Sequence, residues 1–224
     1  MRKLFKFIKK IIFLCVFLVT LVVSIIIYNG YKLYKEVTTK ESIEKKVENI
    51  VNSKDYLSFE KIPKDFVVAL VSVEDHRFFE HFGVDIVSIG RAVVTNLEEK
   101  KLAEGGSTIT QQLAKNMYFE FDRKITRKIA ELFVAFELEE KYKKEEILAM
   151  YIDIIYFGEG YYGLSQASKG YYNKEPSELN YEQLTLLAGL PNAPSAFNPV
   201  KNPDLAKQRQ SLVKEAVAKY KIKL

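Results

Sequence analysis

Two adjacent carboxylates, Glu74 and Asp75, follow an apolar run of residues and could carry acid or base chemistry. A carboxylate held against apolar surface keeps its proton more tightly, which can place its pKa in the range useful for proton transfer. If the helix continues past this pair, Glu74 and His81 share one of its faces. Gly83 would then end the helix in the left-handed conformation, and Asp85 would cap the next one. The pair is equally compatible with an ordinary charged helix end.

A second stretch that could do chemistry is GGSTITQQLAKN, at residues 105–116. Its glycines let the backbone approach a ligand, and the helix expected from Thr108 offers N–H groups that suit phosphate. Thr108 and Gln111 have the spacing of a capping box. Gln111 and Lys115 share one face of this helix, with Gln112 beside them. Taken alone, a glycine turn before a capped polar helix explains the stretch more simply.

A third group combines cations with an acid in the middle of a helix. Arg127 and Glu131 are four residues apart and face the same way, and Glu131 interrupts an otherwise apolar segment. The arginine would keep that carboxylate ionised. Arg123 is a further cation nearby in sequence. By spacing alone, a surface ion pair worth a few tenths of a kcal/mol is the simpler interpretation.

Other signals are weaker. The stretch YFGEGYYG at 156–163 could stack on sugars or fill the core beside a turn.

His76 and His81 are five residues apart, so they do not form a zinc pair on one helix face. Ser-x-x-Lys occurs three times, without the Lys-Thr-Gly that accompanies it in penicillin-sensitive transpeptidases. No set of metal ligands is legible, and no compact motif for reading RNA or DNA is present.

The whole chain has 224 residues, which suits one domain plus an additional segment. A hydrophobic content of 48% supports a sizeable core. The net charge of +5 favours anionic partners without identifying them. The single cysteine, Cys15, excludes an internal disulfide framework.

The N-terminus predicts a membrane anchor. Residues 1–10 hold five basic residues and no acid, and residues 11–31 carry no charge. This apolar run is long enough to span a bilayer, and its length and the missing cleavage site favour a retained anchor over a cleaved signal peptide. The basic flank should stay in the cytoplasm, which places the rest of the chain outside the cell membrane. We therefore divide the chain into an anchor (1–31), a charged connector (32–58) and a folded domain (59–224).

Helical periodicity continues through the domain, and the sequence shows no convincing sheet, so the predicted fold class is mainly α. The second helix is expected to bury Ile86, Ile89, Val93 and Leu97. The expected helices cover residues 65–81, 85–101, 108–116, 126–141, 145–156, 164–172, 181–190 and 204–220.

Taken together, these stretches resemble the five motifs of the peptidoglycan glycosyltransferase family, the transglycosylase module of penicillin-binding proteins. The chain resembles the monofunctional form, which has an anchor and no transpeptidase domain. It departs from the family pattern at Asp153, where Asn is usual, and at Ala130, where many members carry Lys. The matching stretches are EDHRFFEHFG at 74–83, GGSTITQQLAKN at 105–116, RKIAE at 127–131, EEILAMYIDIIYFGEGYYG at 145–163 and LNYEQLTLLAGLPNAPSAFNP at 179–199.

The resemblance implies a lysozyme-like helical fold with a small membrane-facing jaw over residues 102–125. It also implies lipid II as substrate and growth of a β-1,4 glycan chain at the outer membrane leaflet. Glu74 would be the general base, and Glu131 would act with the cations near the pyrophosphate leaving group. The implied substrate-binding residues are Asp75, Thr108, Gln111, Gln112, Lys115, Arg123 and Arg127.

The resemblance further implies a divalent cation, Mg²⁺ or Mn²⁺, near the pyrophosphate, and no organic cofactor. Expected partners are lipid II, the growing glycan, the membrane, separate transpeptidases and proteins of the division or elongation machinery; nucleic acid is not expected. Two other functions are compatible with parts of the sequence. A lysozyme-like glycan-cleaving enzyme would share the fold but has less need of the cations, since no pyrophosphate leaves. A noncatalytic cell-wall scaffold would not require Glu74 and Glu131.

Overall fold

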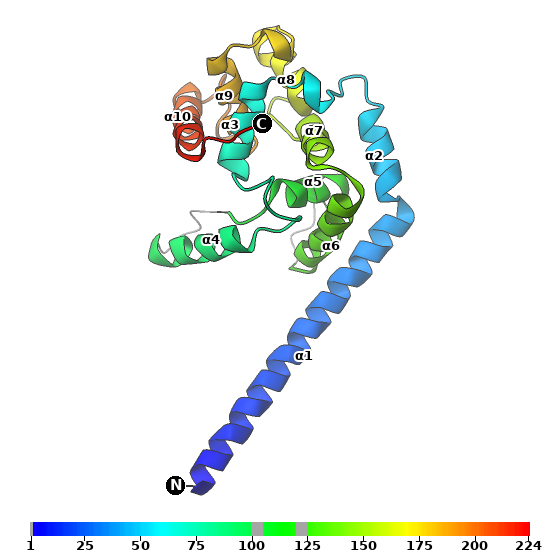
Figure 1. The fold of residues 1–224 in the computed structure, drawn as a ribbon, viewed down its shortest axis with the longest axis vertical. Helices are drawn as coiled ribbons and strands as arrows, with labels where there is room; N and C mark the ends of the chain where they lie inside the picture. The colour runs from blue at the N-terminus through cyan, green and yellow to red at the C-terminus, as the bar shows by residue number, and fades with distance from the viewer. Residues whose placement is uncertain (1, 100–104, 120–124) are drawn as a thin grey trace.

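The computed structural model describes residues 2–99, 105–119 and 125–224, and within these ranges the chain is helical with no strand (Figure 1). The prediction of a mainly α fold is confirmed. The α-helices are α1 (Arg2–Lys40), α2 (Ile43–Val51), α3 (Lys64–Glu74), α4 (Ile86–Glu99), α5 (Ile109–Tyr118), α6 (Ile125–Lys141), α7 (Lys144–Ile154), α8 (Gly163–Tyr172), α9 (Tyr181–Gly189) and α10 (Pro203–Tyr220). Two short 3-10 helices cover Phe59–Lys61 and Pro176–Glu178.

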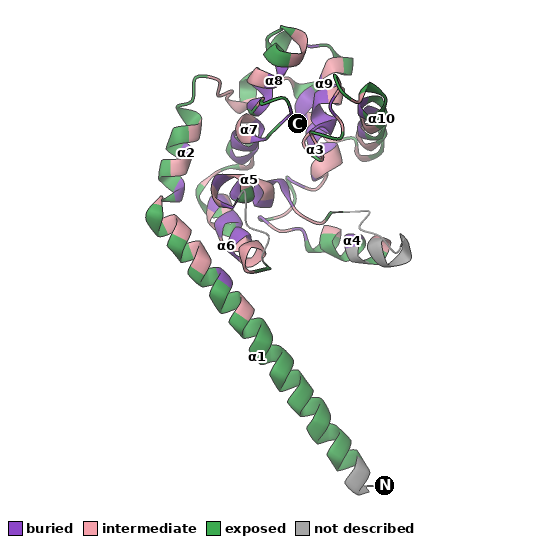
Figure 2. Ribbon diagram, turned by 180° about the vertical axis from the view of Figure 1, so that it is seen from behind, coloured by how far each residue is buried: buried purple, intermediate pink, exposed green. Residues whose placement is uncertain are grey.

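Helix α1 extends far from the rest of the molecule and is exposed over most of its length (Figures 1 and 2). Its segment Phe5–Lys40 is long and apolar enough to cross a membrane, and its most apolar window has no buried residue. A helix that leaves many large apolar side chains exposed fits a single-pass membrane anchor.

The C-terminal part of α1 packs closely on α6. Gly30 is buried there, and a Cβ added to it would lie 2.4 Å from the Cβ of Ile129, so only glycine allows this approach. The next turn of α1 brings the ring of Tyr34 over Phe133, with centroids 5.6 Å apart. The Tyr34 hydroxyl also donates a hydrogen bond to Glu137. The anchor is therefore joined directly to a helix of the domain.

Residues 32–58, predicted to be a connector, are helical over much of their length. Helix α1 continues to Lys40, and α2 places Ile43 and Val47 in the same buried core as the helices that follow. The family resemblance gave no sign of this packing, because its five motifs begin only at Glu74.

The core has two groups of helices. Helix α3 packs against α9 and α10, and α5 packs against α6 and α7. Fully buried side chains such as Phe66, Leu113, Leu138, Ile147 and Tyr151 fill the interior, where the buried residues gather in Figure 2. The C-terminal end of α3 and the start of α5 thus come from different groups and meet between them (Figure 1).

A helix was predicted over residues 65–81, but α3 ends at Glu74. The next residue, Asp75, leaves the helix with an extended φ of −161°. This exit lets the Asp75 carboxylate accept a hydrogen bond of 3.0 Å from the N–H of Ile109, the first residue of α5. The prediction that Glu74 and His81 share a helix face is therefore wrong, and His81 instead contacts Asp75. Gly83 has the predicted left-handed conformation, with a φ of +72°, but it does not end α3, which stops nine residues earlier. The prediction that Asp85 caps the next helix is confirmed, because its carboxylate accepts a hydrogen bond from the N–H of Ser88 in α4.

Helix α4 projects away from the other helices of the domain (Figures 1 and 2). The prediction that its apolar stripe is buried is wrong for Ile86 and Ile89, which are 80% and 39% exposed. The side chains of Val93 and Leu97 lie outside those described. A helical period shows that apolar residues share a face, but not that protein covers this face.

Asp153 gives a prediction about stability. Burial raises its pKa from 3.8 to about 6, and the nearby charge of Asp55 adds to the effect. Because the folded state prefers the protonated form, the free energy of unfolding should fall as the pH rises from about 4 to about 6 and stay lower above. If the whole pKa shift contributed, the free energy of unfolding would fall by roughly 3 kcal/mol. Solvent screening at this half-buried side chain reduces the expected fall to about 1 kcal/mol.

Asp153→Asn should therefore raise the Tm by about 3 °C at pH 8 and change it little at pH 4. Thermal unfolding of the two proteins in detergent measures this difference. Glu215→Gln, at an exposed acid on α10, serves as the control and should leave the Tm nearly unchanged at both pH values. A change in Tm that is the same at pH 4 and pH 8 would show that ionisation of Asp153 does not limit stability.

Candidate active site

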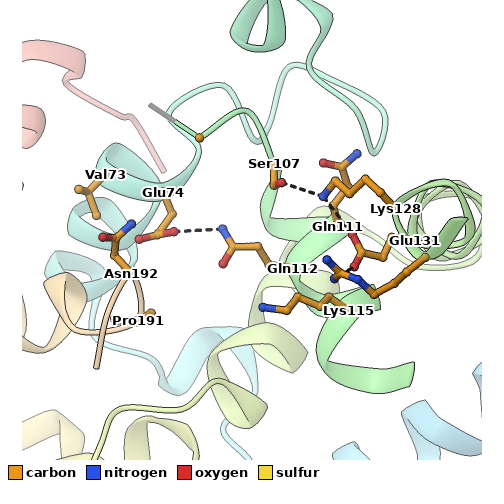
Figure 3. A pocket seen from close by; sticks show the side chains of 12 residues that line it. Val73, Glu74, Ser107, Gln111, Gln112, Lys115, Lys128, Glu131, Pro191 and Asn192 are labelled. Carbon is orange, nitrogen blue, oxygen red and sulfur yellow. Dashed lines mark hydrogen bonds and ion pairs between the residues drawn. The ribbon is translucent and has the colours of Figure 1, made fainter. Parts of the chain in front are cut away.

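A cavity of about 360 Å³ lies where the end of α3 faces α5 and α6 (Figure 3). One wall carries Glu74 at the end of α3 and the turn at Pro191 and Asn192. The opposite wall carries polar and charged side chains of α5 and α6. The lining residues are Val73, Glu74, Gly105, Ser107, Gln111, Gln112, Lys115, Arg127, Lys128, Glu131, Pro191 and Asn192.

Glu74 is held in a fixed orientation at the cavity. Its side chain is 7% exposed, and its Oε2 accepts a hydrogen bond of 3.0 Å from Nε2 of Gln112 (Figure 3). The Oε1 of Gln112 in turn accepts a hydrogen bond of 2.8 Å from the hydroxyl of the fully buried Tyr151. Since Tyr151 donates to the amide oxygen, the amide nitrogen must point at the carboxylate.

Burial raises the pKa of Glu74 above its usual value. The hydrogen bond from Gln112 and the charge of Arg209 oppose this shift, while the charge of Asp75 adds to it. A carboxylate whose pKa is raised is a stronger base once it is ionised. The raised pKa expected of Glu74 from its place after an apolar run therefore agrees with its surroundings.

Asp75 and Thr108 lie behind the cavity and do not line it. Both Asp75 oxygens are within 3.1 Å of Nε2 of His81, and one also accepts from the first N–H of α5. Thr108 caps α5 and donates a hydrogen bond of 2.7 Å to the carbonyl oxygen of Gly83. The predicted capping box between Thr108 and Gln111 is confirmed. These contacts fix the start of α5 against the end of α3.

The opposite wall is a cluster of cations around one buried acid. Glu131 has no exposed surface and forms ion pairs with Arg127 and with Lys128, the latter at 3.0 Å. Lys128 also donates a hydrogen bond of 2.7 Å to the hydroxyl of Ser107, which ties the glycine-rich stretch to α6. Lys115 adds an exposed cation from α5. This wall suits a ligand with several negative charges, such as a pyrophosphate.

A resident divalent cation does not fit the donors of this wall. Mg²⁺ and Mn²⁺ prefer carboxylate, carbonyl and water oxygens. The acid here is Glu131, which Arg127 and Lys128 already neutralise, and Lys115 adds further positive charge. Across the described ranges, no group of three or more His, Cys, Asp or Glu side chains could hold a metal ion.

Most of the predicted site residues come together. Glu74, Gln111, Gln112, Lys115, Arg127 and Glu131 all line the cavity. Arg123 lies outside the described residues, as do residues 102–104 and 120–124 of the predicted jaw.

Sequence reasoning missed Lys128, Tyr151 and Arg209. The spacing of Lys128, three residues before Glu131, was a usable signal. Tyr151 and Arg209 are distant from Glu74 along the chain, and no local spacing indicates their contacts.

Comparison with known proteins gives one consistent result. Residues 40–218 match the family model described as Transglycosylase. Penicillin-binding protein 1F of Bacillus subtilis strain 168 is 42% identical over 161 residues, which are 72% of this chain and 22% of that protein. Penicillin-binding protein 1A of Aquifex aeolicus is 41% identical over 163 residues, 73% of this chain and 22% of that protein. A Cupriavidus necator protein, provisionally named a transglycosylase, is 44% identical over 156 residues, 70% of this chain and 67% of its own.

The chain thus spans less than a quarter of the length of the two penicillin-binding proteins, and about two thirds of the third relative. In all three cases the similarity covers about 70% of this chain, and the matched family region includes every helix that lines the cavity.

Proposed function

The chain belongs to the transglycosylase family, and from this premise we propose that it is a peptidoglycan glycosyltransferase that polymerises lipid II into β-1,4-linked glycan strands. The observation that carries the proposal is the two-sided cavity. A buried carboxylate with a raised pKa, Glu74, faces a wall that carries Glu131 and Lys128 together with Lys115 (Figure 3). On this wall Arg127 and Lys128 form ion pairs with Glu131. Joining sugars from a lipid pyrophosphate donor requires both a base and an anion-binding wall.

In the proposed reaction, Glu74 takes the proton from the 4-hydroxyl group of the acceptor sugar. That oxygen attacks the anomeric carbon of the donor chain, and the bond from this carbon to the pyrophosphate oxygen breaks. The leaving group, undecaprenyl pyrophosphate, gains negative charge as it departs. Lys115, Arg127 and Lys128 would stabilise this charge in place, since cations preorganised at a developing anion lower the barrier. The proton on Glu74 passes to solvent before the next addition.

Glu131 would act through the cations. Its buried carboxylate holds Arg127 and Lys128 together on one side of α6. Without this anion the two like charges would repel each other and move apart. Its proposed role is therefore to keep the pyrophosphate-binding groups at the spacing the leaving group needs.

The cations also distinguish the proposal from a glycan-cleaving enzyme. Glycosidases of the common type place two carboxylates on either side of the scissile bond, where they act as acid and as base or nucleophile. Here the second carboxylate, Glu131, is fully buried and engaged by two cations, which does not suit an acid or nucleophile that must contact a sugar ring.

The proposed orientation follows from the charge of the anchor. A basic flank before an apolar helix stays in the cytoplasm, so the domain after α1 would face the outer side of the membrane. A lipid-linked substrate would then meet the cavity at the membrane surface.

Incubation of the purified full-length protein with labelled lipid II tests the proposal. We expect polymer that lysozyme can digest. Folded protein that yields no polymer would favour a scaffold, and release of fragments from preformed glycan would favour a cleaving enzyme.

A further inference from the structure

Arg209 connects helix α10 to the end of α3. Its Nη2 lies 3.5 Å from Oε1 of Glu74, and its Nε donates a hydrogen bond of 3.2 Å to the carbonyl oxygen of Gly189 at the end of α9. Its guanidinium carbon lies 5.7 Å from the ring centroid of Phe197. With 14% of its side chain exposed, Arg209 is held in one place by three separate parts of the chain.

The side chain of Arg209 passes through a narrow space between α9 and α10, beside Gly189. A Cβ added to Gly189 would lie 3.0 Å from Cγ of Arg209 and 3.3 Å from Cγ2 of Val213. The absence of a side chain at Gly189 therefore lets the arginine pass across α9 toward Glu74.

Arg209 approaches Glu74 from the side that is closed to solvent. Oε1 of Glu74 is buried and makes no hydrogen bond within the described part of the chain, whereas Oε2 accepts from Gln112. Arg209 is not among the residues that line the cavity. The carboxylate is thus held by a neutral amide at one oxygen and by a cation at the other, and the cation would not touch a substrate in the cavity.

The position of this cation opposes the effect of burial. Removal of a carboxylate from water favours its neutral form, and a cation within about 4–6 Å favours the ionised form. A general base must be ionised at the working pH before it can accept a proton. Among the described residues, the charges that act on the buried Glu74 carboxylate are those of Arg209 and Asp75, and Asp75 acts in the unfavourable direction.

We infer that Arg209 is a positioning residue that keeps Glu74 ionised and fixes its carboxylate for proton transfer. This inference rests on the proposed function, because it assigns Glu74 the role of base.

The test is the pH dependence of kcat for lipid II polymerisation by the full-length protein and three variants. Arg209→Met should shift the acid limb of the profile upward by about one pH unit. Activity on that limb should then fall about tenfold and largely recover at higher pH. Arg209→Lys should shift the limb less, because it keeps the charge. Lys207→Met removes an exposed cation from the same helix and should leave the limb in place.

A loss by the same factor at every pH would overturn the inference, since it would show a purely structural role. If Arg209→Met does not fold, as judged by circular dichroism, Arg209→Gln repeats the test, because it retains a donor for the Gly189 carbonyl and lacks the charge.

A second measurement needs no substrate and separates this inference from the proposed function. The carboxyl carbon of Glu74 can be titrated by ¹³C NMR of glutamate-labelled protein, with its signal assigned by loss in Glu74→Gln. Arg209→Met should raise the midpoint by about one unit. An unchanged midpoint would overturn the inference even if the wild-type protein polymerises lipid II. A raised midpoint in a protein that makes no polymer would support the contact and contradict only the proposed reaction.

Discussion

Glu74→Gln is expected to lower the rate of lipid II polymerisation by about a thousandfold while the protein stays folded. Glutamine has nearly the same shape as glutamate, so the side chain can still fill its site and accept a hydrogen bond from Gln112 through its amide oxygen. It cannot accept a proton at the pH of the reaction. Steady-state rates with labelled lipid II measure the effect, and circular dichroism verifies the fold.

Glu80→Gln is the matched control for this substitution. Glu80 lies six residues along the chain, is 63% exposed and pairs with Arg77 at 3.4 Å, outside the cavity. Its substitution should leave the rate close to that of the wild type. If Glu74→Gln retained more than about a tenth of the wild-type rate, the base would have to be another residue.

Glu131→Gln is expected to lower turnover by about a hundredfold, the effect typical of losing one electrostatic contributor to a transition state. The substitution removes the anion between Arg127 and Lys128, and the two cations then repel each other. Because the charge of the pyrophosphate grows as it leaves, kcat should fall more than KM rises. The amide keeps its volume and an acceptor oxygen, so the fold should be retained.

Glu140→Gln, at an exposed position on the same helix, is the control for Glu131 and should have little effect on kcat. Turnover of Glu131→Gln close to wild type would contradict the role given to Glu131. A fall in kcat that vanishes when the assay temperature is lowered, together with a lower Tm, would attribute the loss to unfolding instead.

The sequence was most informative where the relevant contacts are local. The Thr108–Gln111 capping box, the Asp85 cap, the positive φ of Gly83 and the pairing of Arg127 with Glu131 all follow from short spacings, and all occur in the structure. The acid at the end of an apolar helix was also informative, because its burial follows from its neighbours.

The remaining features depend on contacts between distant parts of the chain. Periodicity predicted a helix through His81, but the hydrogen bond between Asp75 and the start of α5 ends α3 earlier. The contact of Arg209 with Glu74 joins residues far apart in sequence, which no short pattern encodes. Periodicity identified the apolar stripe of α4, but whether other helices cover this stripe depends on where the whole helix is placed.

The close contact between Gly30 and Ile129 has a mechanical consequence. Ile129 is the sequence neighbour of Lys128. Helix α1 therefore packs on α6 within one turn of Arg127 and Lys128, the α6 cations that would meet the leaving group. Helices respond to bilayers of different thickness by tilting. If α1 anchors the chain, a tilt of α1 in the bilayer would move α6 with it, because the two helices are packed closely together rather than joined by a flexible linker. The height of these cations over the lipid surface is then a property of the bilayer as well as of the protein.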